Sequence, residues 1–501
     1  MIMAGIFEFI SAVAVVVILT WYYYYAFKYT FWSKQGVKGP KPSFPFGNVK
    51  ELVFGSESIT NLMRNLYTKY KHEPIIGFYN FGTPMVLLKD PDLIKDVLIK
   101  NFSNFSDRGQ PVAERADPLS QNLVNLEPKK WKPLRIKLSP TFTSGKIKEM
   151  YHLMVECSKK LEDYMAKDIP FSKDIECRDL LGKFTMEIIG SCAFGINVNA
   201  LSNEENEFLL NSKLFFVRGV RKRAAQNFPK LYNLLGYILP YAKQTKFFSK
   251  IVADNIEYRK TNNVVRHDFI DLLLELKDCP DKLGLEITDE FLAAQAVVFF
   301  LAGYETSALV MSHALYELAL HQEIQEKLRD EIKKTIAKCG GKLEIDDIKS
   351  MEYLNAVYRE ILRKYSPISI LKRKAAEGYT FNGTKVHIPK GTEIIIPVWA
   401  LHRDPDIYPE PDVFDPNRFL NKESTIKHPM HYLPFGDGPR NCIGARFAVH
   451  QTKLGIITVI KNFKVDVCEK TISTYEVDSK SLFLAPKQGL HVKLINLNSQ
   501  Q

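Results

Sequence analysis

The chain has 501 residues, of which 46% are hydrophobic and 25% are charged, so it holds ample material for a globular core. Its formal net charge of +11 is scattered along the sequence rather than gathered in a tail, which argues against a nucleic-acid partner. The seven cysteines are widely spaced and form no C-x-x-C pair, which argues against zinc and indicates a reducing compartment. No linker, repeat or low-complexity tract follows residue 50, so we expect one large unit over residues 49–501.

An apolar segment stands near the N-terminus. Residues 9–27, FISAVAVVVILTWYYYYAF, carry no charge and are long enough to span a bilayer core as a helix. A cleaved signal peptide is the alternative, but the segment lacks a basic start and ends in bulky aromatics. Basic residues follow it, beginning with Lys28 and Lys34, and the positive-inside rule then places the body of the chain in the cytosol. The sequence predicts a single-pass membrane anchor over residues 1–32.

Two further segments bear on the membrane. Three prolines, Pro40, Pro42 and Pro45, restrict the backbone after the anchor and predict a stiff, proline-rich stalk over residues 33–48. Residues 214–240 mix aromatic and aliphatic side chains with arginines, which suits a surface that dips into lipid headgroups. An amphipathic helix packed on the protein's own core is the alternative for this second segment.

The strongest helical pattern covers residues 289–321 and is apolar almost all round, as in a buried core helix or a second membrane span. Glu305, Thr306 and His313 in its middle favour the core helix, because a charge is costly in lipid. Thr306 is expected to bond back to the carbonyl of Ala302 and to open a groove that holds its hydroxyl and the Glu305 carboxylate. The alternative is a threonine satisfied within its own helix and a glutamate paired with a distant cation.

Strand-like runs are short and few. They cover residues 85–90, residues 391–399 and the run LHVKLI near the C-terminus. Because helical patterns dominate the rest of the chain, we expect a mainly α fold with small β-sheets.

Two pairs of polar residues have helical spacing. Trp131 and Arg135, at i and i+4, can present hydrogen-bond donors from one face, although a core tryptophan with an arginine snorkelling beside it is the alternative. Glu360 and Arg363, at i and i+3, share a helical face, a spacing that surface helices also contain in large numbers. Neither pair is diagnostic by itself.

The most informative run is PFGDGPRNCIGARFA, residues 434–448, which sets Cys442 in a glycine-rich loop before a predicted helix. Gly436 and Gly438 permit close backbone approaches, and the N–H groups of such a loop can point at one atom. A sulfur at the N-terminal end of a helix beginning near Ile443 would be held as a thiolate by those donors and by the helix dipole.

Two chemistries use a stabilised thiolate. A nucleophilic cysteine needs a histidine base, and His402 or His431 would have to approach Cys442 through the fold. The other possibility is that the thiolate ligates a metal, and haem iron would need one such thiolate with an apolar helix facing it.

Taken together, these motifs resemble those of the cytochrome P450 monooxygenases. FGDGPRNCIG, residues 435–444, matches the haem-binding loop F-x-x-G-x-R-x-C-x-G, and AGYET, residues 302–306, matches the oxygen-activating A-G-x-[DE]-T. The E-x-x-R pair, the W-x-x-x-R pair and DPNRF at residues 415–419, where the family has P-x-R-F, follow the same order. The likeness runs from the anchor to the C-terminus and implies the cytochrome P450 fold with an N-terminal transmembrane helix. Two departures are Asn417, where a glutamate is common, and Pro133, which requires the W-x-x-x-R helix either to start near residue 130 or to be kinked.

The resemblance implies a role for each matched residue. Cys442 would be the metal ligand, binding the iron of haem b as a thiolate. The residues expected to contact the haem or its propionates are Trp131, Arg135, Arg373, Phe435, Gly436, Arg440, Cys442 and Gly444, with Arg108 as a further candidate. Glu360, Arg363 and Arg418 would form a structural ion-pair triad on the thiolate side. Thr306 and Glu305 would be catalytic, delivering protons during oxygen activation.

The chain looks most like the microsomal, xenobiotic-metabolising branch of the animal enzymes, and in particular like insect detoxifying members. That likeness implies insertion of one atom of O2 into a lipophilic small molecule, while the other atom leaves as water. The electrons would come from NADPH through NADPH-cytochrome P450 reductase, with cytochrome b5 as a further partner. We expect an endoplasmic reticulum membrane protein that contacts lipid, has its catalytic domain in the cytosol and binds no nucleic acid.

The substrate walls and the reductase surface are also expectations. The walls should come from residues 109–125, 205–240, 295–306, 366–371 and 480–485. Five lysines are candidates for docking an acidic reductase, with solvated surface charge as the alternative: Lys129, Lys130, Lys132, Lys372 and Lys374. Two other functions stay open, namely a haem-thiolate isomerase or dehydratase that needs no reductase, and a non-enzymatic haem carrier or sensor.

Overall fold

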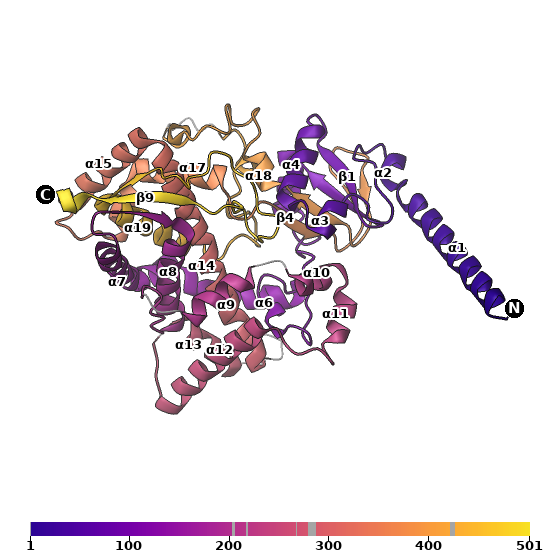
Figure 1. Cartoon of the computed structure of the whole chain (residues 1–501), viewed down its shortest axis with the longest axis horizontal. Helices are drawn as coiled ribbons and strands as arrows, with labels where there is room; N and C mark the ends of the chain where they lie inside the picture. The colour runs from indigo at the N-terminus through magenta and orange to yellow at the C-terminus, as the bar shows by residue number, and fades with distance from the viewer. Residues whose placement is uncertain are drawn as a thin grey trace.

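A long helix, α14 (Asp289–Leu320), runs through the body of the computed structural model, and several other helices of the body pack against it (Figure 1). The structure describes residues 2–202, 206–216, 219–266, 268–278, 287–420 and 426–500. The other longer helices are α1 (Ile2–Lys28), α4 (Ile59–Lys69), α6 (Pro128–Leu138), α7 (Ser144–Asp168), α8 (Cys177–Ile189), α9 (Glu207–Phe215), α10 (Val220–Asn227), α12 (Lys243–Asn262), α13 (Phe269–Asp278), α15 (Gln322–Lys338), α17 (Glu352–Lys364) and α19 (Ala445–Asn462). The shorter ones are α2 (Phe31–Lys34), α3 (Lys50–Phe54), α5 (Pro91–Lys95), α11 (Pro229–Leu235), α16 (Ile345–Ser350) and α18 (Val398–Leu401).

The strands form small sheets at the edges of this helical body. They are β1 (Ile75–Asn80), β2 (Thr83–Leu88), β3 (Ser172–Glu176), β4 (Leu371–Lys374), β5 (Tyr379–Thr380), β6 (His387–Ile388), β7 (Glu393–Ile396), β8 (Phe463–Asp466) and β9 (His491–Asn496). The largest sheet has the order β1-β2-β7-β4, the second β3-β9-β8, and β5 pairs with β6. Within the largest sheet β2 and β7 are parallel, while the other pairs are antiparallel. The expected mainly α fold with small sheets is confirmed.

Helix α14 is a core helix. Its most apolar stretch is 72% buried, and it packs against α8, α12 and α19. Because it is apolar on nearly every face, other helices can cover it on all sides and bury few polar groups. The prediction of a buried helix at residues 289–321 is confirmed.

Helix α1, in contrast, is exposed rather than buried. It projects from the body as an isolated rod, and the apolar stretch within Gly5–Lys34, with a mean hydropathy of 2.0, is not buried at all (Figure 1). Length and hydropathy make it a candidate membrane span, as predicted. At its base the aromatic ring of Tyr25 lies 5.5 Å from that of Phe44, so the foot of the helix touches the body.

The segment predicted as a stalk, residues 33–48, packs along strand β1. Trp32, just before it, is buried and donates its indole N–H to the carbonyl of Phe78 at 3.1 Å. At the other end Asn48 accepts from the backbone N–H of Tyr79 at 2.9 Å. These bonds fix the point from which α1 leaves the body.

The shorter predicted strands need one correction. The runs at residues 85–90 and 490–495 correspond to β2 and β9, but the run at 391–399 ends as a strand at Ile396. Pro397 has no N–H to continue the pairing, and the chain turns into α18 directly after it.

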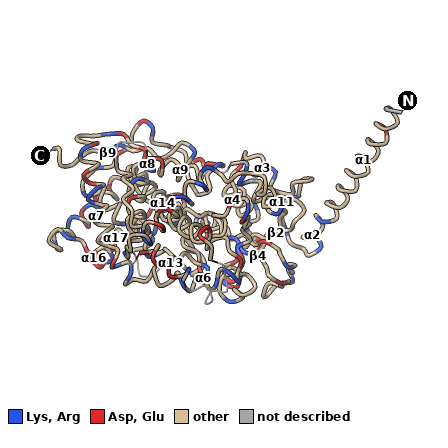
Figure 2. Tube along the Cα trace, turned by 90° about the horizontal axis from the view of Figure 1, so that it is seen from below, with Lys and Arg blue, Asp and Glu red and all other residues tan. Residues whose placement is uncertain are grey.

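Basic and acidic residues are interspersed along the trace of the body, while α1 carries few of either (Figure 2). In residues 228–241 large apolar side chains are exposed instead, for example Ile238 at 77% and Tyr237 at 66%. Tyr232 of the same stretch is buried beside Ala113 and Ala116, so this stretch turns one side to the body and the other outward.

Candidate active site

A cavity of about 930 Å³ lies between α14 and the glycine-rich loop. Its lining contains every residue predicted to bind the cofactor: Trp131, Arg135, Arg373, Phe435, Gly436, Arg440, Cys442 and Gly444, together with Arg108 and Thr306. All five segments predicted as substrate walls contribute lining residues, among them Leu119, Phe216, Leu301, Ile368 and Phe483. Glu305, Glu360, Arg363 and Arg418 are not among the lining residues that the structure describes.

The glycine-rich loop places Cys442 at the cavity wall. Gly436 and Gly438 adopt positive φ values of 68° and 73°, which favour glycine. A Cβ atom on Gly438 would stand only 2.0 Å from the carbonyl oxygen of Leu98, so a side chain there would break the packing of the loop. The backbone N–H of Cys442 donates to the carbonyl of Phe435 at 2.9 Å, which closes the loop.

The surroundings of the Cys442 sulfur favour a thiolate once a cation is bound. The thiol faces the cavity, and the protein atoms packed around it raise its pKa by desolvation, while the backbone N–H of Gly444 and the charges on Arg135 and Arg108 act in the opposite direction. Helix α19 begins at Ala445, directly after this loop, so its positive N-terminal end lies beside the sulfur.

The histidines that a cysteine nucleophile would need lie elsewhere. His402 is buried and accepts the backbone N–H of Leu433 at 2.8 Å through Nε2. Neither His402 nor His431 is among the described residues that line the cavity. The geometry therefore favours a thiolate ligand over a cysteine–histidine pair.

Four arginines concentrate positive charge on the cavity wall. Burial lowers the pKa of Arg373 and of Arg440 to about 9 and that of Arg108 to about 10, and repulsion between these groups adds to the effect. Within the described chain none of the four, Arg135 included, has a carboxylate ion-pair partner. Buried charge of one sign without a counter-ion is unfavourable unless an anionic ligand neutralises it.

Individual contacts hold these arginines in place. Arg440 donates to the carbonyl of Leu126 at 2.7 Å and lies over the ring of Trp131 at 4.2 Å. Arg135 makes two hydrogen bonds of 3.0 Å to Asn441. The Nε groups of Arg373 and Arg440 are buried without a protein acceptor. A group that carries carboxylates fits this wall, and the propionates of a haem are such carboxylates.

Pro133 lies inside α6, the helix that carries Trp131 and Arg135. The helix starts at Pro128, earlier than residue 130, and continues through Pro133 to Leu138. Because Pro133 has no N–H, the helix lacks the hydrogen bond to the carbonyl of Lys129, and the proline ring crowds that carbonyl. Both motif residues nevertheless reach the cavity.

Ala302, Gly303 and Thr306 of helix α14 line the cavity, and we call this part of the wall the α14 groove. The Thr306 hydroxyl donates to the carbonyl of Ala302 at 2.6 Å, as expected. A Cβ on Gly303 would come within 2.5 Å of the Ile189 side chain, so a larger residue there would require that side chain to move. The helix stays continuous through this groove.

Glu305 does not share this groove, which corrects one expectation. Its carboxylate is fully buried and forms an ion pair with Arg178 of α8. Burial acts to lower the pKa of Arg178, but the neighbouring Glu305 raises it above its ordinary value. The groove therefore holds a hydroxyl without a carboxylate, because residue 305 points to the adjacent helix, and the alternative of a glutamate paired with a distant cation is what the structure shows.

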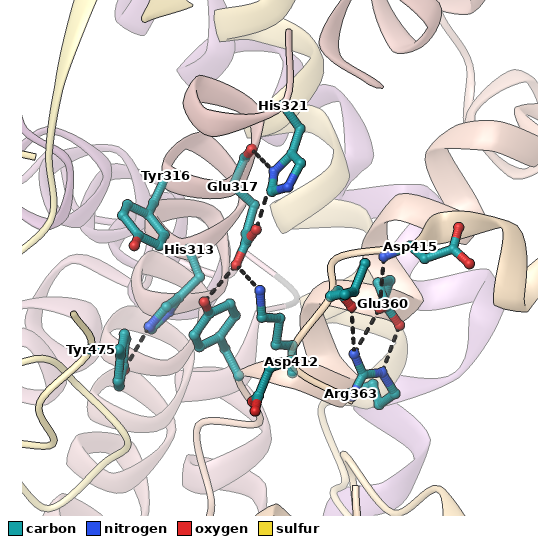
Figure 3. A network of polar contacts seen from close by, with 12 residues as sticks. His313, Tyr316, Glu317, His321, Glu360, Arg363, Asp412, Asp415 and Tyr475 are labelled. Carbon is teal, nitrogen blue, oxygen red and sulfur yellow. Dashed lines mark hydrogen bonds and ion pairs between the residues drawn. The ribbon is translucent and has the colours of Figure 1, made fainter. Parts of the chain in front are cut away.

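The predicted triad forms away from the cavity. Arg363 donates to both carboxylate oxygens of Glu360 at 2.7 Å, and both side chains are fully buried (Figure 3). The Nε of Arg418 lies 3.5 Å from Glu360, and the backbone N–H of Asp415 donates to the same carboxylate at 3.0 Å. Arg363 also donates to the carbonyl of His402 at 2.9 Å. The pair therefore connects α17 to the segment before the glycine-rich loop.

Two supporting residues were not foreseen. Arg178 lies far from Glu305 in sequence, and only the packing of α8 against α14 brings them together. Asn441 sits inside the recognised loop at a variable position of the motif, yet it fixes the guanidinium of Arg135. No spacing rule would have linked either partner to its motif residue.

Comparisons with known proteins agree with this geometry. The family model for cytochrome P450 matches residues 37–494. Cytochrome P450 6a2 of Drosophila melanogaster is 38% identical over 489 residues, covering 94% of this chain and 96% of that protein. Cytochrome P450 6B7 of Helicoverpa armigera is 36% identical, covering 97% of this chain and 98% of that protein. Cytochrome P450 6k1 of Blattella germanica is also 36% identical, covering 95% of each. With its cysteine loop, its arginine-lined cavity and its grooved central helix, the chain belongs to the cytochrome P450 family of haem-thiolate monooxygenases.

Proposed function

We propose that this enzyme inserts one atom of O2 into lipophilic small molecules, xenobiotics among them, with electrons from NADPH delivered by a membrane-bound flavoprotein reductase. The observation that carries the proposal is that one cavity is lined by a loop cysteine, four arginines and the hydroxyl-bearing groove of α14. A thiolate-ligated haem supplies the redox chemistry that cleaves O2. The chain's own residues hold that group, exclude water and supply protons.

Cys442 would ligate the iron, and the arginine wall would neutralise the propionates. Arg373 and Arg440 each have a buried Nε group that such a carboxylate could satisfy. The Arg440 guanidinium lies over the face of the Trp131 ring, and this cation–π contact would help to hold it in place. Thr306 would hold a water or a proton in the α14 groove, while Glu305 supports that part of the helix through Arg178.

The remaining walls explain a preference for lipophilic substrates. The lining beyond the arginines is mainly aliphatic and aromatic, for example Leu119, Leu301, Ile368, Leu482 and Phe483. Such walls bind by burying apolar area and place few directional demands on the ligand. A broad range of apolar compounds is therefore expected.

The reductase would dock near the thiolate, where some lysines are free of local partners. Lys129 and Lys132 are exposed on α6. Lys372 instead pairs with Glu393 at 2.8 Å, and Lys130 pairs with Glu114 at 3.4 Å. Of the five lysines considered, Lys129 and Lys132 are the exposed ones, whereas Lys130, Lys372 and Lys374 are partly buried. Lys129 and Lys132 are therefore the better candidates for recruiting an acidic reductase, and the same face could serve cytochrome b5.

The first experiment tests the ligand. The ferrous carbon monoxide complex of the full chain should show the red-shifted Soret band of thiolate ligation, and Cys442→His should abolish it. Cys339→Ser removes a thiol that is not among the cavity-lining residues and should leave the band unchanged. A wild-type band at the position typical of histidine-ligated haem would refute the assignment. Reductase-dependent consumption of NADPH then separates a monooxygenase from a haem-thiolate isomerase or dehydratase.

A truncation tests the membrane assignment. Deleting residues 2–28 should leave a haem-loaded body, because the bonds to β1 begin only at Tyr29, whose carbonyl accepts from Tyr79 at 2.9 Å. The exposed apolar side chains of residues 228–241 should keep part of this body on membranes. Sedimentation with microsomes measures the bound fraction, and complete solubility would remove the second contact. We place the full chain in the endoplasmic reticulum membrane with the catalytic domain in the cytosol.

A further inference from the structure

A buried histidine on α14 has no part in the function described above. His313 lies seven residues after Thr306 and is fully buried. Its Nδ1 is 2.7 Å from the carbonyl oxygen of Leu309, and its Nε2 is 2.8 Å from the hydroxyl of Tyr475 (Figure 3). Since a carbonyl can only accept, Nδ1 carries the proton and Nε2 accepts from Tyr475. Burial lowers the pKa of His313 to about 3, so the ring stays neutral and keeps its acceptor.

The imidazole is held rigidly. Its ring stacks on that of Tyr365, with centroids 4.3 Å apart and planes 19° from parallel. The Tyr365 hydroxyl in turn donates to Glu317 at 2.5 Å, and Lys364 donates to the same carboxylate oxygen at 2.6 Å. Tyr365, on which His313 stacks, is tied to α14 through Glu317 and directly follows α17 in the chain. His313 is therefore a fixed acceptor.

Tyr475 belongs to a segment that reaches back into the cavity. We call residues 472–486 the C-terminal loop. At its start the hydroxyl of Tyr316 donates to the carbonyl of Ile472 at 3.0 Å, and near its end the N–H of Leu484 donates to the carbonyl of Pro367 at 3.0 Å. Across the loop the N–H of Asp478 donates to the carbonyl of Ala485 at 2.9 Å.

The tip of the C-terminal loop forms part of the substrate wall. Leu482 and Phe483 line the cavity, and the ring of Phe483 lies 5.2 Å from that of Phe216. Leu484 packs in a small core with Tyr365 and Trp399, against which Tyr475 also packs. Displacing Tyr475 would therefore disturb the base on which Leu482 and Phe483 stand.

We propose that His313 is a positioning residue that sets the place of the C-terminal loop through Tyr475 and thereby controls how large ligands fit in the cavity. An apolar ring at position 313 would keep the stack on Tyr365 but would leave the Tyr475 hydroxyl without its acceptor. The hydroxyl would turn toward another partner and carry the loop with it. This inference rests on the proposed function, because it concerns ligands of the same haem cavity.

The test compares two iron-binding probes of different size in the haem-loaded full chain. Imidazole is too small to reach the C-terminal loop, whereas clotrimazole carries the same ring on a bulky triphenylmethyl group. In His313→Phe we expect clotrimazole to bind about fivefold more weakly by Soret titration, while imidazole binding changes less than about twofold. Amide hydrogen exchange within residues 472–486 should accelerate about tenfold.

Tyr475→Phe removes the same hydrogen bond from the other side and keeps both rings. It should reproduce the two effects, and the double variant should add little to either single change. Tyr475→Phe carries the test by itself if His313→Phe does not fold. Tyr151→Phe is the matched control, because it removes another buried tyrosine bond, 3.1 Å to the carbonyl of Leu343, without touching the loop.

Three results would overturn the proposal. One is an equal loss of affinity for imidazole and clotrimazole, which would indicate general damage to the haem site. Another is unchanged exchange in the C-terminal loop. The last is full additivity of the two single variants. Failure of the wild type to bind imidazole at its iron would instead refute the proposed function.

Discussion

The two sides of the cavity are built in contrasting ways. Outside the cavity, in the support behind its thiolate side, the Glu360 carboxylate is engaged by two bonds from Arg363, by the backbone N–H of Asp415 and by a longer contact with Arg418. On the α14 side the groove is lined by Ala302 and Gly303, which bring no polar side chain, and by Thr306, whose hydroxyl bonds only its own helix.

This contrast separates residues that hold the haem site together from residues that take part in its chemistry. Buried charges that are fully paired tolerate no loss, because removing one partner strands the other in a low-dielectric core. A groove of small residues can lose a hydroxyl without opening the core, since little packing depends on it. Changes on the thiolate side should therefore destroy the haem site, and changes in the α14 groove should alter only its chemistry.

The largest effect is expected for the buried pair. Glu360→Ala leaves the buried Arg363 without its carboxylate, and Arg363→Ala leaves the buried Glu360 with only the longer ion pair to Arg418, so we expect each change to cost about 3 to 5 kcal/mol. That is a large share of a stability margin of about 5 to 15 kcal/mol. Both variants should fail to retain haem, as measured by haem content per chain after purification, and should unfold at lower urea concentration.

The control for this prediction is a pair of the same spacing on the surface. Asp346 and Lys349 lie 2.9 Å apart at i and i+3, with both side chains more than half exposed. Asp346→Ala should leave both the urea midpoint and the haem content close to those of the wild type, because an exposed ion pair contributes little to stability. Normal haem content in Glu360→Ala would contradict the proposal that changes on the thiolate side destroy the haem site while changes in the α14 groove do not.

An intermediate effect is expected where α14 meets α8. Arg178→Ala leaves the buried Glu305 carboxylate without its cation, whereas Glu305→Gln leaves Arg178, which is about one-third exposed and can reach water. Arg178→Ala should therefore be the more damaging change, by about 1 to 3 kcal/mol. Equal losses in urea unfolding would show that the exposure of Arg178 has no influence.

The same pair predicts a pH dependence. Burial raises the pKa of Glu305, and Arg178 opposes that rise. Without Arg178 the pKa should rise further, so the folded state would bind a proton more tightly than the unfolded state. The deficit of Arg178→Ala should then be small at low pH and grow as the pH rises through the folded pKa of Glu305. A deficit that shrinks with rising pH would contradict this sign.

The parts of the site that the sequence predicted are those in which the functional residues stand close together in the chain. The loop around Cys442, the Glu360–Arg363 pair and the core helix containing Thr306 could all be placed, because glycine positions and helical periodicity are local signals. The motifs that contain Trp131 and Arg440 predicted that both lie at the haem, and the structure places both on the cavity wall.

The rest depends on contacts between distant segments. Glu305 was expected in the groove with Thr306, but adjacent helical positions point about 100° apart, and Arg178 holds residue 305 on the other side. The link between His313 and Tyr475 joins residues far apart in the chain, as does the packing of residues 33–48 on β1. Periodicity identifies a buried face but does not name the partner that covers it.

The smallest structural effect, and the sharpest chemical one, is expected for Thr306→Ala. The Thr306 hydroxyl bonds only the carbonyl of Ala302 one turn earlier, and alanine is a good helix former, so the stability should change by less than about 1 kcal/mol. Haem content and the carbon monoxide spectrum should be unchanged.

What is lost is a hydroxyl that can hold a water or a proton in the groove. NADPH oxidation should then continue while product per NADPH falls and hydrogen peroxide rises, and Thr306→Ser, which keeps the hydroxyl, should stay close to the wild type. If Thr306→Ala instead loses haem, the two sides of the cavity differ less than their contacts indicate; if coupling stays at the wild-type value, Thr306 only shapes the helix, and protons reach the cavity through another group.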